Sequence, residues 1–220
     1  MRRSRGRRRY SRRREVNLEE WVPKTRLGKM IQEGRISSIE EIFMEGLRIR
    51  EPQIVDTLLP GIQEEVININ LVQKQTDAGR RSRFKAIVAV GNREGYIGLG
   101  SGKARQVRAA IEKAAVDARL NIVPVRRGCG SWECGCGRQH SVQFQVEGKC
   151  GGVQVVILPG PRGLGLVAGE VARVILGLVG IKDCWTRSYG STRTVPSFAY
   201  AVFDALKRTY SLITPADWVR

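Results

Sequence analysis

The sequence predicts an α+β protein with two folded domains, and three observations lead to this prediction. Apolar and polar residues alternate over residues 65–73, as in a half-buried β-strand. Over residues 103–121 and 197–209, apolar residues instead recur at the spacing of an amphipathic helix. The composition then changes to glycine and cysteine near residues 124–128, which indicates a boundary. A chain of 220 residues is long enough to bury a core in each of two such domains.

Residues 1–60 are expected to form a basic arm and a helical extension. Residues 2–14 contain nine arginines and no acid, so this arm is either a solvated tail or an extension that becomes ordered on RNA. An irregular connector should begin at Trp21. A helix should then begin after Ser38, with Leu47 on its apolar face, and a second should span residues 52–59.

The first domain is predicted to span residues 61–127. Strands are expected over residues 65–73, 83–90 and 96–99, and a helix over residues 103–121. The order of a helix, three antiparallel strands and a helix resembles a double-stranded-RNA-binding domain.

The second domain is predicted to span residues 128–220 and to begin with a cysteine-rich loop over residues 129–140. It is also of the α+β class. Its expected strands cover residues 141–146, 152–158 and 181–188, and its expected helices cover residues 165–179 and 197–209.

The charge of the chain indicates a polyanionic partner. The formal net charge is +17 with a pI near 10.5, and removing the nine arginines of the arm still leaves +8. Nucleic acid is favoured over an anionic membrane. The most apolar run, residues 164–181, is interrupted by Glu170 and Arg173, so we expect no membrane segment. Five cysteines, an odd number, favour a cytoplasmic protein without a disulfide framework.

Two groups of cations are the candidate RNA contacts. One crowds the turn into the second strand, and the other follows a glycine-rich corner at the expected start of the helix over residues 103–121, where free N–H groups also favour phosphate. A Walker loop is excluded because Ile97 and Ala104 occupy positions that need glycine and Ser/Thr. With two arginines after this helix, the candidates are Arg80, Arg81, Arg83, Lys85, Gly100, Gly102, Lys103, Arg105, Arg126 and Arg127.

The cysteine-rich loop offers a possible structural zinc site. Cys129, Cys134, Cys136 and His140 would supply three thiolates and an imidazole, which is a tetrahedral donor set. The spacing is not that of a standard zinc knuckle, and free thiols in a flexible loop are the alternative. Farther on, the GxxG run at residues 160–163 is either a phosphate clamp or a plain turn.

Two long runs resemble the small-subunit ribosomal protein S5 family, in its archaeal type. They are RRSRFKAIVAVGNREGYIGLGSGKARQVRAAIEKAAVDARLNIVPV and PGPRGLGLVAGEVARVILGLVGIKDCWTRSYGSTRTVPSFAYAVFDAL. WVPKTRLGKMIQEGRISSIEEIF and CGSWECGCG also look archaeal. The resemblance implies a variant double-stranded-RNA-binding fold followed by a domain with a left-handed βαβ crossover. It further implies binding to small-subunit ribosomal RNA, neighbouring ribosomal proteins, a role in subunit assembly and decoding accuracy, and a position near the path by which messenger RNA enters.

The residues themselves give no case for catalysis, and two other classes of function remain as alternatives. A metal-dependent RNA-processing enzyme would use the cysteine loop as a catalytic site with Glu133 as its general base. A zinc-containing regulator would bind duplex DNA, although no recognition-helix pattern is present. We expect a structural, RNA-binding protein of the ribosome.

Overall fold

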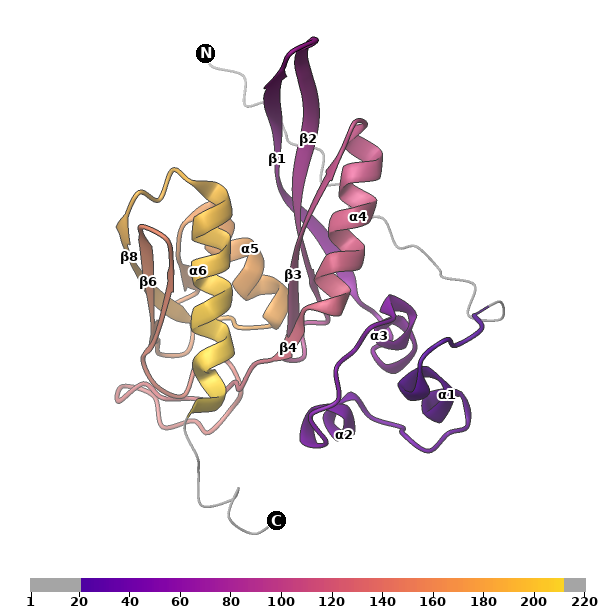
Figure 1. Ribbon diagram of the computed structural model, residues 1–220. Coiled ribbons are helices and arrows are strands. Elements are labelled where there is room, and N and C mark those ends of the chain that lie inside the picture. Colours follow the sequence, from indigo (N-terminus) through magenta and orange to yellow (C-terminus); the bar gives the residue numbers. More distant parts are fainter. Residues whose placement is uncertain (1–20, 212–220) are drawn as a thin grey trace, which may run out of the picture.

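The computed structural model describes residues 21–211, which form two four-stranded sheets with helices packed against them (Figure 1). The α+β class predicted from the sequence is confirmed, whereas the prediction for the arginine-rich arm lies outside the described residues. The helices are α1 (Arg26–Gln32), α2 (Ile39–Met44), α3 (Pro52–Leu58), α4 (Val107–Leu120), α5 (Glu170–Val179) and α6 (Val195–Lys207). The strands are β1 (Gln63–Thr76), β2 (Gly79–Gly91), β3 (Tyr96–Ala104), β4 (Ile122–Pro124), β5 (Val146–Cys150), β6 (Val153–Pro159), β7 (Leu166–Val167) and β8 (Cys184–Gly190).

Helices α1 to α3 form a small unit around a core in which Ile42 and Ile54 are fully buried and to which Ile122 of β4 also belongs. The expected connector is wrong, because α1 begins within it after Thr25, whose side chain accepts a hydrogen bond from the Gly28 N–H. A helix of seven residues is too short for its apolar spacing to be evident. The helix predicted to include Leu47 ends at Met44, and Leu47 is exposed.

The first sheet has four antiparallel strands in the order β1-β2-β3-β4, one more than the three predicted. Strand β4 was missed because its three residues, which follow α4 directly, are too few to show alternation. Buried Arg119 of α4 joins this sheet to the helical unit by pairing with Asp56 of α3 and Glu64 of β1. Burial alone would lower the pKa of Arg119, but these two carboxylates outweigh it and raise that pKa.

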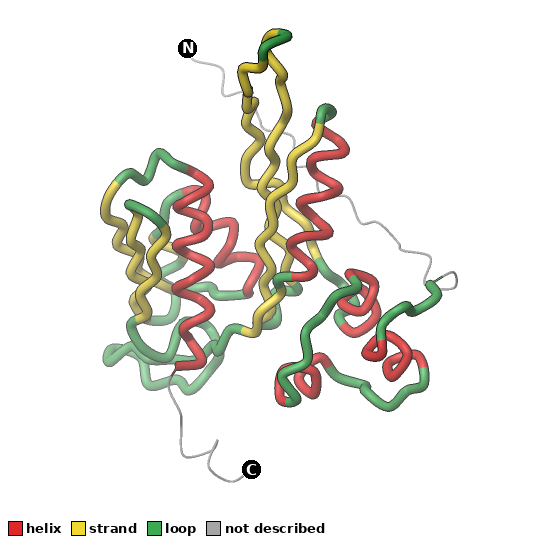
Figure 2. The backbone as a smooth tube through the Cα atoms, viewed as in Figure 1, coloured by secondary structure: helices red, strands yellow, loops and turns green. Residues whose placement is uncertain are grey.

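The two faces of the first sheet pack against different parts of the chain, as the alternation along β2 requires. Ala86 and Val88 contact the alanines of α4, whereas Ile87 and Ala89 belong to a core shared with α5 and α6. Accordingly, α4 lies on one side of the sheet and the C-terminal half of the chain on the other (Figure 2). The turn between β2 and β3 also binds the end of α5, where the Arg93 N–H donates to the Leu178 carbonyl at 2.8 Å.

The helix predicted to start at Lys103 starts instead at Val107, and β3 runs through the glycine-rich segment as far as Ala104. Gly100 and Gly102 face α4. A Cβ atom built on Gly102 would lie 2.6 Å from the Ala114 nitrogen, well inside contact distance. Glycine therefore lets the α4 backbone pack directly on the strand, which is the packing reason for a motif that resembled a nucleotide loop.

The second sheet is mixed, with strands in the order β5-β6-β8-β7; β7 and β8 are parallel neighbours joined through α5. The strand predicted over residues 141–146 is wrong, because Ser141 forms only an isolated bridge with Gly128, residues 142–145 are irregular, and β5 begins at Val146. The helix predicted from residue 165 begins only at Glu170, after β7 and a turn. Within residues 21–211, none of the helices has the length and apolar character needed to cross a bilayer.

Candidate nucleic-acid interface and metal site

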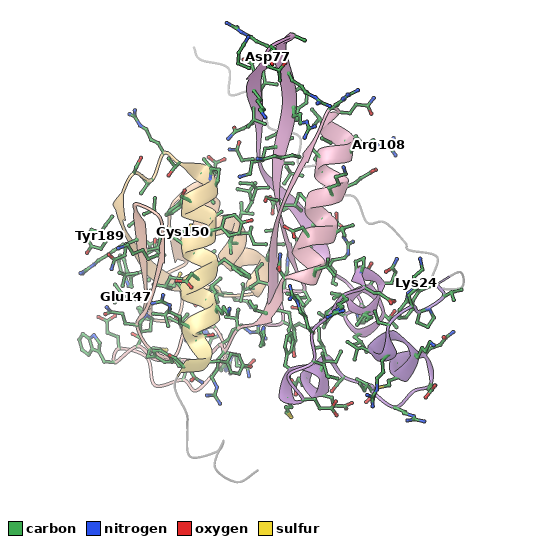
Figure 3. The ribbon with its side chains drawn as sticks, viewed as in Figure 1. Lys24, Asp77, Arg108, Glu147, Cys150 and Tyr189 are labelled. Atoms are coloured by element: carbon green, nitrogen blue, oxygen red, sulfur yellow. The ribbon has the colours of Figure 1, made fainter. Side chains whose placement is uncertain are left out.

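The hairpin of β1 and β2 extends well beyond the rest of the first sheet, with Asp77 at its tip (Figures 1 and 3). Beyond an irregularity at Ile67, its strands pair without a break from Asn68 out to Thr76 and Gly79, so the extension is a regular ribbon. The Thr76 hydroxyl donates to the Gly79 carbonyl at 2.7 Å and closes the turn. Side chains on the outer half of the ribbon are mostly exposed, which makes this part available to a partner.

Strand register collects five cations on one face of this ribbon. Arg81, Arg83 and Lys85 alternate along β2 and therefore point to the same side. Residues directly opposite each other on neighbouring strands point to the same side of the sheet. Lys74 lies opposite Arg81 and Lys103 lies opposite Lys85, so both lysines are on that side too. We call this surface the basic hairpin face; its residues are Lys74, Arg81, Arg83, Lys85 and Lys103.

The basic hairpin face is electrostatically costly in isolation. Like charges directly opposite each other in a sheet destabilise it, and two such pairs occur here. Among residues 21–211, no acidic side chain forms an ion pair with any of the five cations. A polyanion lying on this face would remove the repulsion, so the charge pattern fits a bound phosphate backbone.

The other predicted RNA contacts are not on this face. Arg80 precedes Arg81 in β2, so its side chain points to the opposite face of the ribbon, the face toward α4. Arg105 is exposed in the link between β3 and α4. Gly100 and Gly102 are buried against α4, so their backbone is not open to a ligand.

Arg126 and Arg127 lie at the junction of the two halves of the chain and contact protein groups. The Arg126 guanidinium carbon is 5.7 Å from the centre of the Tyr210 ring, and the Arg126 N–H donates to Thr209 Oγ1 at 3.0 Å. Arg127 Nη1 donates to the Arg93 carbonyl at 3.1 Å, and burial lowers the Arg127 pKa. Both arginines therefore support the link between the domains.

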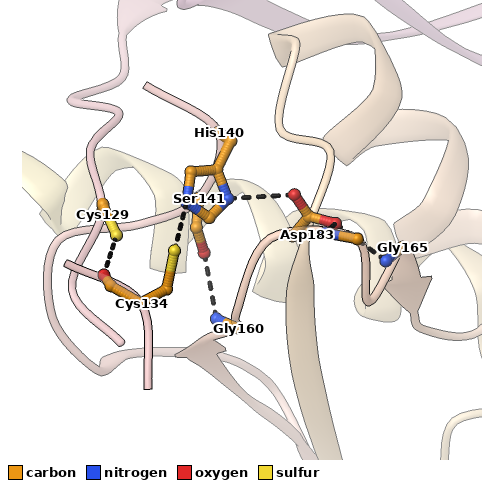
Figure 4. Close-up of polar contacts among 8 residues, drawn as sticks. Cys129, Cys134, His140, Ser141, Gly160, Gly165 and Asp183 are labelled. Atoms are coloured by element: carbon orange, nitrogen blue, oxygen red, sulfur yellow. Dashed lines mark hydrogen bonds and ion pairs between the residues drawn. The ribbon is translucent and has the colours of Figure 1, made fainter. Parts of the chain in front are cut away.

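The cysteine-rich loop brings its four candidate metal ligands together. One donor atom from each of Cys129, Cys134, Cys136 and His140 lies within 4.8 Å of the others. Figure 4 shows Cys129, Cys134 and His140 of this group. His140 is buried, and the three cysteines are half-buried. Three sulfurs and one nitrogen at such separations can converge on one ion with little movement.

His140 is oriented by Asp183 rather than by the loop alone. Its Nδ1 lies 3.0 Å from Asp183 Oδ2, and its Nε2 faces Cys134 Sγ at 3.9 Å. A carboxylate that holds one ring nitrogen while the other faces the metal is the usual environment of a ligating histidine.

The environment of Cys134 favours the thiolate form that metal binding requires. A hydrogen bond from the Arg162 backbone N–H, with further bonds from the backbone and thiol of Cys136, lowers the pKa of Cys134 to about 6. By contrast, burial raises the pKa of Cys184, in β8, to about 12. Cys134 therefore differs from an ordinary buried thiol in the way that a metal ligand should. The pKa of Cys136 is shifted the other way: a hydrogen bond with the Arg138 backbone lowers it, but burial and the thiols of Cys134 and Cys129 outweigh this bond and raise it.

In the turn at residues 160–165, the backbone N–H groups that a phosphate clamp would need are bonded to side chains of the same domain. The Gly160 N–H donates to Ser141 Oγ at 3.1 Å, and the N–H groups of Gly163 and Gly165 donate to Asp183 Oδ1 at 3.1 and 2.8 Å. Of the two sequence interpretations, the structure favours a turn that closes on its own domain.

Comparison with known proteins decides the family. Residues 62–126 match the family described as ribosomal protein S5, N-terminal domain, and residues 148–217 match ribosomal protein S5, C-terminal domain. The chain belongs to the ribosomal protein S5 family. The resemblance predicted from the sequence is thereby confirmed.

Close archaeal relatives carry the name small ribosomal subunit protein uS5. The one from Aeropyrum pernix is 59% identical over 204 residues, covering 93% of this chain and 94% of its own length. That from Pyrobaculum calidifontis is 60% identical over 195 residues, covering 89% and 96%, and that from Ignicoccus hospitalis is 57% identical over 205 residues, covering 93% and 97%.

Sequence reasoning missed two functional candidates of this S5 family member. Lys74 sits in an otherwise polar strand, and only the hairpin register places it opposite Arg81. Asp183 is 43 residues from His140, and its role appears only when the folded chain joins them. A turn signal at Asp77–Gly79 would have predicted the first; nothing in the local sequence indicates the second.

Proposed function

We propose that this chain is a structural constituent of the small ribosomal subunit and binds its ribosomal RNA through the basic hairpin face. The observation that carries the proposal is the alignment of five cations on one side of a protruding ribbon without acidic partners among the described residues. Family membership supplies the setting, since the relatives are named as small-subunit proteins. Neighbouring ribosomal proteins are its other expected partners.

The proposed binding is mainly electrostatic and reads the shape of the RNA. Lysine and arginine side chains release counterions when they neutralise phosphates, and this supplies affinity without selecting a base. Alternate residues of a strand stand about 7 Å apart, so the face presents its cations in a row along the ribbon. Arg105, exposed beyond Lys103, extends this row toward α4 and is included in the proposed contact.

The test is a variant with Arg81, Arg83 and Lys85 all changed to Gln, compared with wild type for incorporation into small subunits. Sedimentation in sucrose gradients after a salt wash measures incorporation. Binding to small-subunit RNA at several salt concentrations measures the number of phosphate contacts. Each lost contact lowers the slope of log K against log salt by about 0.9, so we expect a drop of about 3.

The matched control removes three exposed cations elsewhere, with Lys149, Arg193 and Lys207 changed to Gln. It changes net charge equally but leaves the hairpin intact, so it should incorporate nearly as well as wild type. If both variants lost incorporation equally, total charge rather than the hairpin would explain binding. Full incorporation of the hairpin variant would refute the assignment.

We also propose that the cysteine-rich loop holds a structural zinc ion. Cys129, Cys134, Cys136 and His140 would be its ligands, and the ion would replace the small apolar core that this glycine-rich loop lacks. Metal analysis of protein purified without added zinc tests this. About one zinc per chain is expected, and a ratio far below one refutes it.

The donor set also bears on the alternative of a metal-dependent enzyme. Four protein ligands close a tetrahedral shell, whereas catalytic zinc keeps a position open for water. A structural role is therefore favoured over the use of Glu133 as a general base. Contact with messenger RNA and an effect on decoding accuracy stay predictions from the family resemblance.

A further inference from the structure

We infer that Asp183 is a positioning residue for the metal site, and that it couples metal binding to the turn at residues 160–165. The inference rests on the proposed zinc site and extends it to a residue outside the cysteine-rich loop. Asp183 precedes β8, and both its side chain and that of His140 are more than nine-tenths buried.

One carboxylate oxygen of Asp183 determines which nitrogen of His140 is free. An ionised carboxylate only accepts hydrogen bonds, so His140 must carry a proton on Nδ1, which lies 3.0 Å from Oδ2. The neutral ring then has its lone pair on Nε2, the nitrogen that faces Cys134. This tautomer is the one that can bind a metal together with the three sulfurs.

The other oxygen of Asp183 is held by the turn. Oδ1 accepts hydrogen bonds from the N–H groups of Gly163 and Gly165, which have φ of 89° and 78°. Those left-handed conformations suit glycine and aim both amides at one atom. The carboxylate is therefore fixed from two sides, by the turn through Oδ1 and by the imidazole through Oδ2 (Figure 4).

The same turn touches the candidate ligands a second time. The Arg162 backbone N–H donates to the Cys134 sulfur, and this bond strengthens when the sulfur is a metal-bound thiolate. Residues 160–165 thus contact one ligand directly and another through Asp183. A metal in the site would order this turn as well as the cysteine-rich loop.

An Asp183→Asn substitution separates this role from simple packing. Asparagine has one acceptor oxygen, and the two glycine amides retain it. Its NH₂ group then faces Nδ1, which must accept, so the proton moves to Nε2 and blocks the metal-binding nitrogen. The side-chain shape is unchanged, yet the preferred tautomer is reversed.

The experiment measures zinc affinity of the full chain by competition with a chromogenic chelator. We expect Asp183→Asn to bind zinc about 10- to 100-fold more weakly than wild type. The control is Ser141→Ala, which removes the Gly160–Ser141 hydrogen bond between the same two segments but does not touch the ring. Its zinc affinity should stay within a few-fold of wild type.

A second background tests the tautomer directly. In His140→Cys the fourth ligand is a thiolate without tautomers, so adding Asp183→Asn should not weaken zinc binding further. An equal loss in both backgrounds, or no loss in the histidine background, overturns the positioning role while leaving the zinc site intact. Absence of zinc from wild type overturns the proposed site and this inference together.

A measurement on wild type avoids dependence on the folding of variants. His140 is the only histidine in the chain, so its ring nitrogens can be assigned without ambiguity by nitrogen NMR. The inference predicts a proton on Nδ1 with and without zinc, and slower amide exchange at Gly163 and Gly165 when zinc is bound. A proton on Nε2 in the metal-free protein, or exchange unaffected by zinc, contradicts it.

Discussion

Replacing Gly102 by Ala should destabilise the first domain, because the added methyl group points into the backbone of α4. The new Cβ would lie 2.6 Å from the Ala114 nitrogen and would also meet the Ala110 carbonyl oxygen. Ordinary contact begins at 3.4 Å and the Ala110 oxygen would lie at only 2.4 Å, so the helix and strand must separate by roughly 1 Å. Overpacking of this kind costs about 1–3 kcal/mol. Backbone atoms cannot rotate away, so we expect the upper end of that range.

Urea unfolding followed by circular dichroism measures the effect. With a slope of about 2 kcal/mol per molar, a loss of about 2–3 kcal/mol lowers the midpoint by roughly 1 M. The matched control is Gly177→Ala within α5, where a Cβ meets no atom within 4 Å. That substitution should stabilise the protein by about 0.5–1 kcal/mol, because it removes the cost of a helical glycine.

The pair of variants separates packing from ligand binding as the reason for the glycine-rich segment. An unchanged unfolding midpoint in Gly102→Ala, with weaker RNA binding, would refute the packing account. It would restore the interpretation in which glycine lets phosphate approach the backbone.

Three further predictions concern ion pairs, a half-buried phenol and the metal. Arg119→Met should lower the free energy of unfolding by about 3 kcal/mol, because the carboxylates of Asp56 and Glu64 lose their partner in a mostly buried site. The control Arg108→Met removes an exposed ion pair and should lower it by less than about 0.5 kcal/mol. A similar loss for both variants would contradict the structure. Burial and, to a lesser extent, the charge of Glu40 raise the pKa of Tyr96 to about 12. The stability conferred by its neutral phenol should therefore be present below about pH 10 and be lost as the pH rises toward 12. Tyr96→Phe should not show this loss when unfolding is measured across that pH range. Chelation should lower the melting temperature of wild type but not of a Cys134→Ser variant, and an equal fall in both would contradict a structural metal.

Local pattern was sufficient to predict long elements and insufficient for short or pairing-dependent ones. The alternation in β1 and the helical spacing in α4 are properties of consecutive residues, and both elements were predicted. The start of α4 was predicted wrongly because glycine and lysine before it resemble a helix-terminal phosphate site. Only the antiparallel pairing of this segment with β2, in which Gly102 lies opposite Ala86, shows that it is a strand.

The candidate RNA site shows the same division. Arg80, Arg81 and Arg83 are adjacent in sequence and were grouped for that reason, but strand geometry turns Arg80 to the other side. Lys74 joins the face through register, which depends on where the hairpin turns. In the metal site, the cysteine cluster was visible as a spacing, whereas Asp183 required the tertiary fold.

The most direct test of the central claim is cross-linking of RNA to protein in purified small subunits, followed by mass spectrometry of the cross-linked peptides. We expect nucleotides to attach to peptides containing the basic hairpin face, on both β1 and β2, and to the segment around Lys103 and Arg105. Cross-links confined to the outer surface of the second sheet, with none on the hairpin, would contradict it.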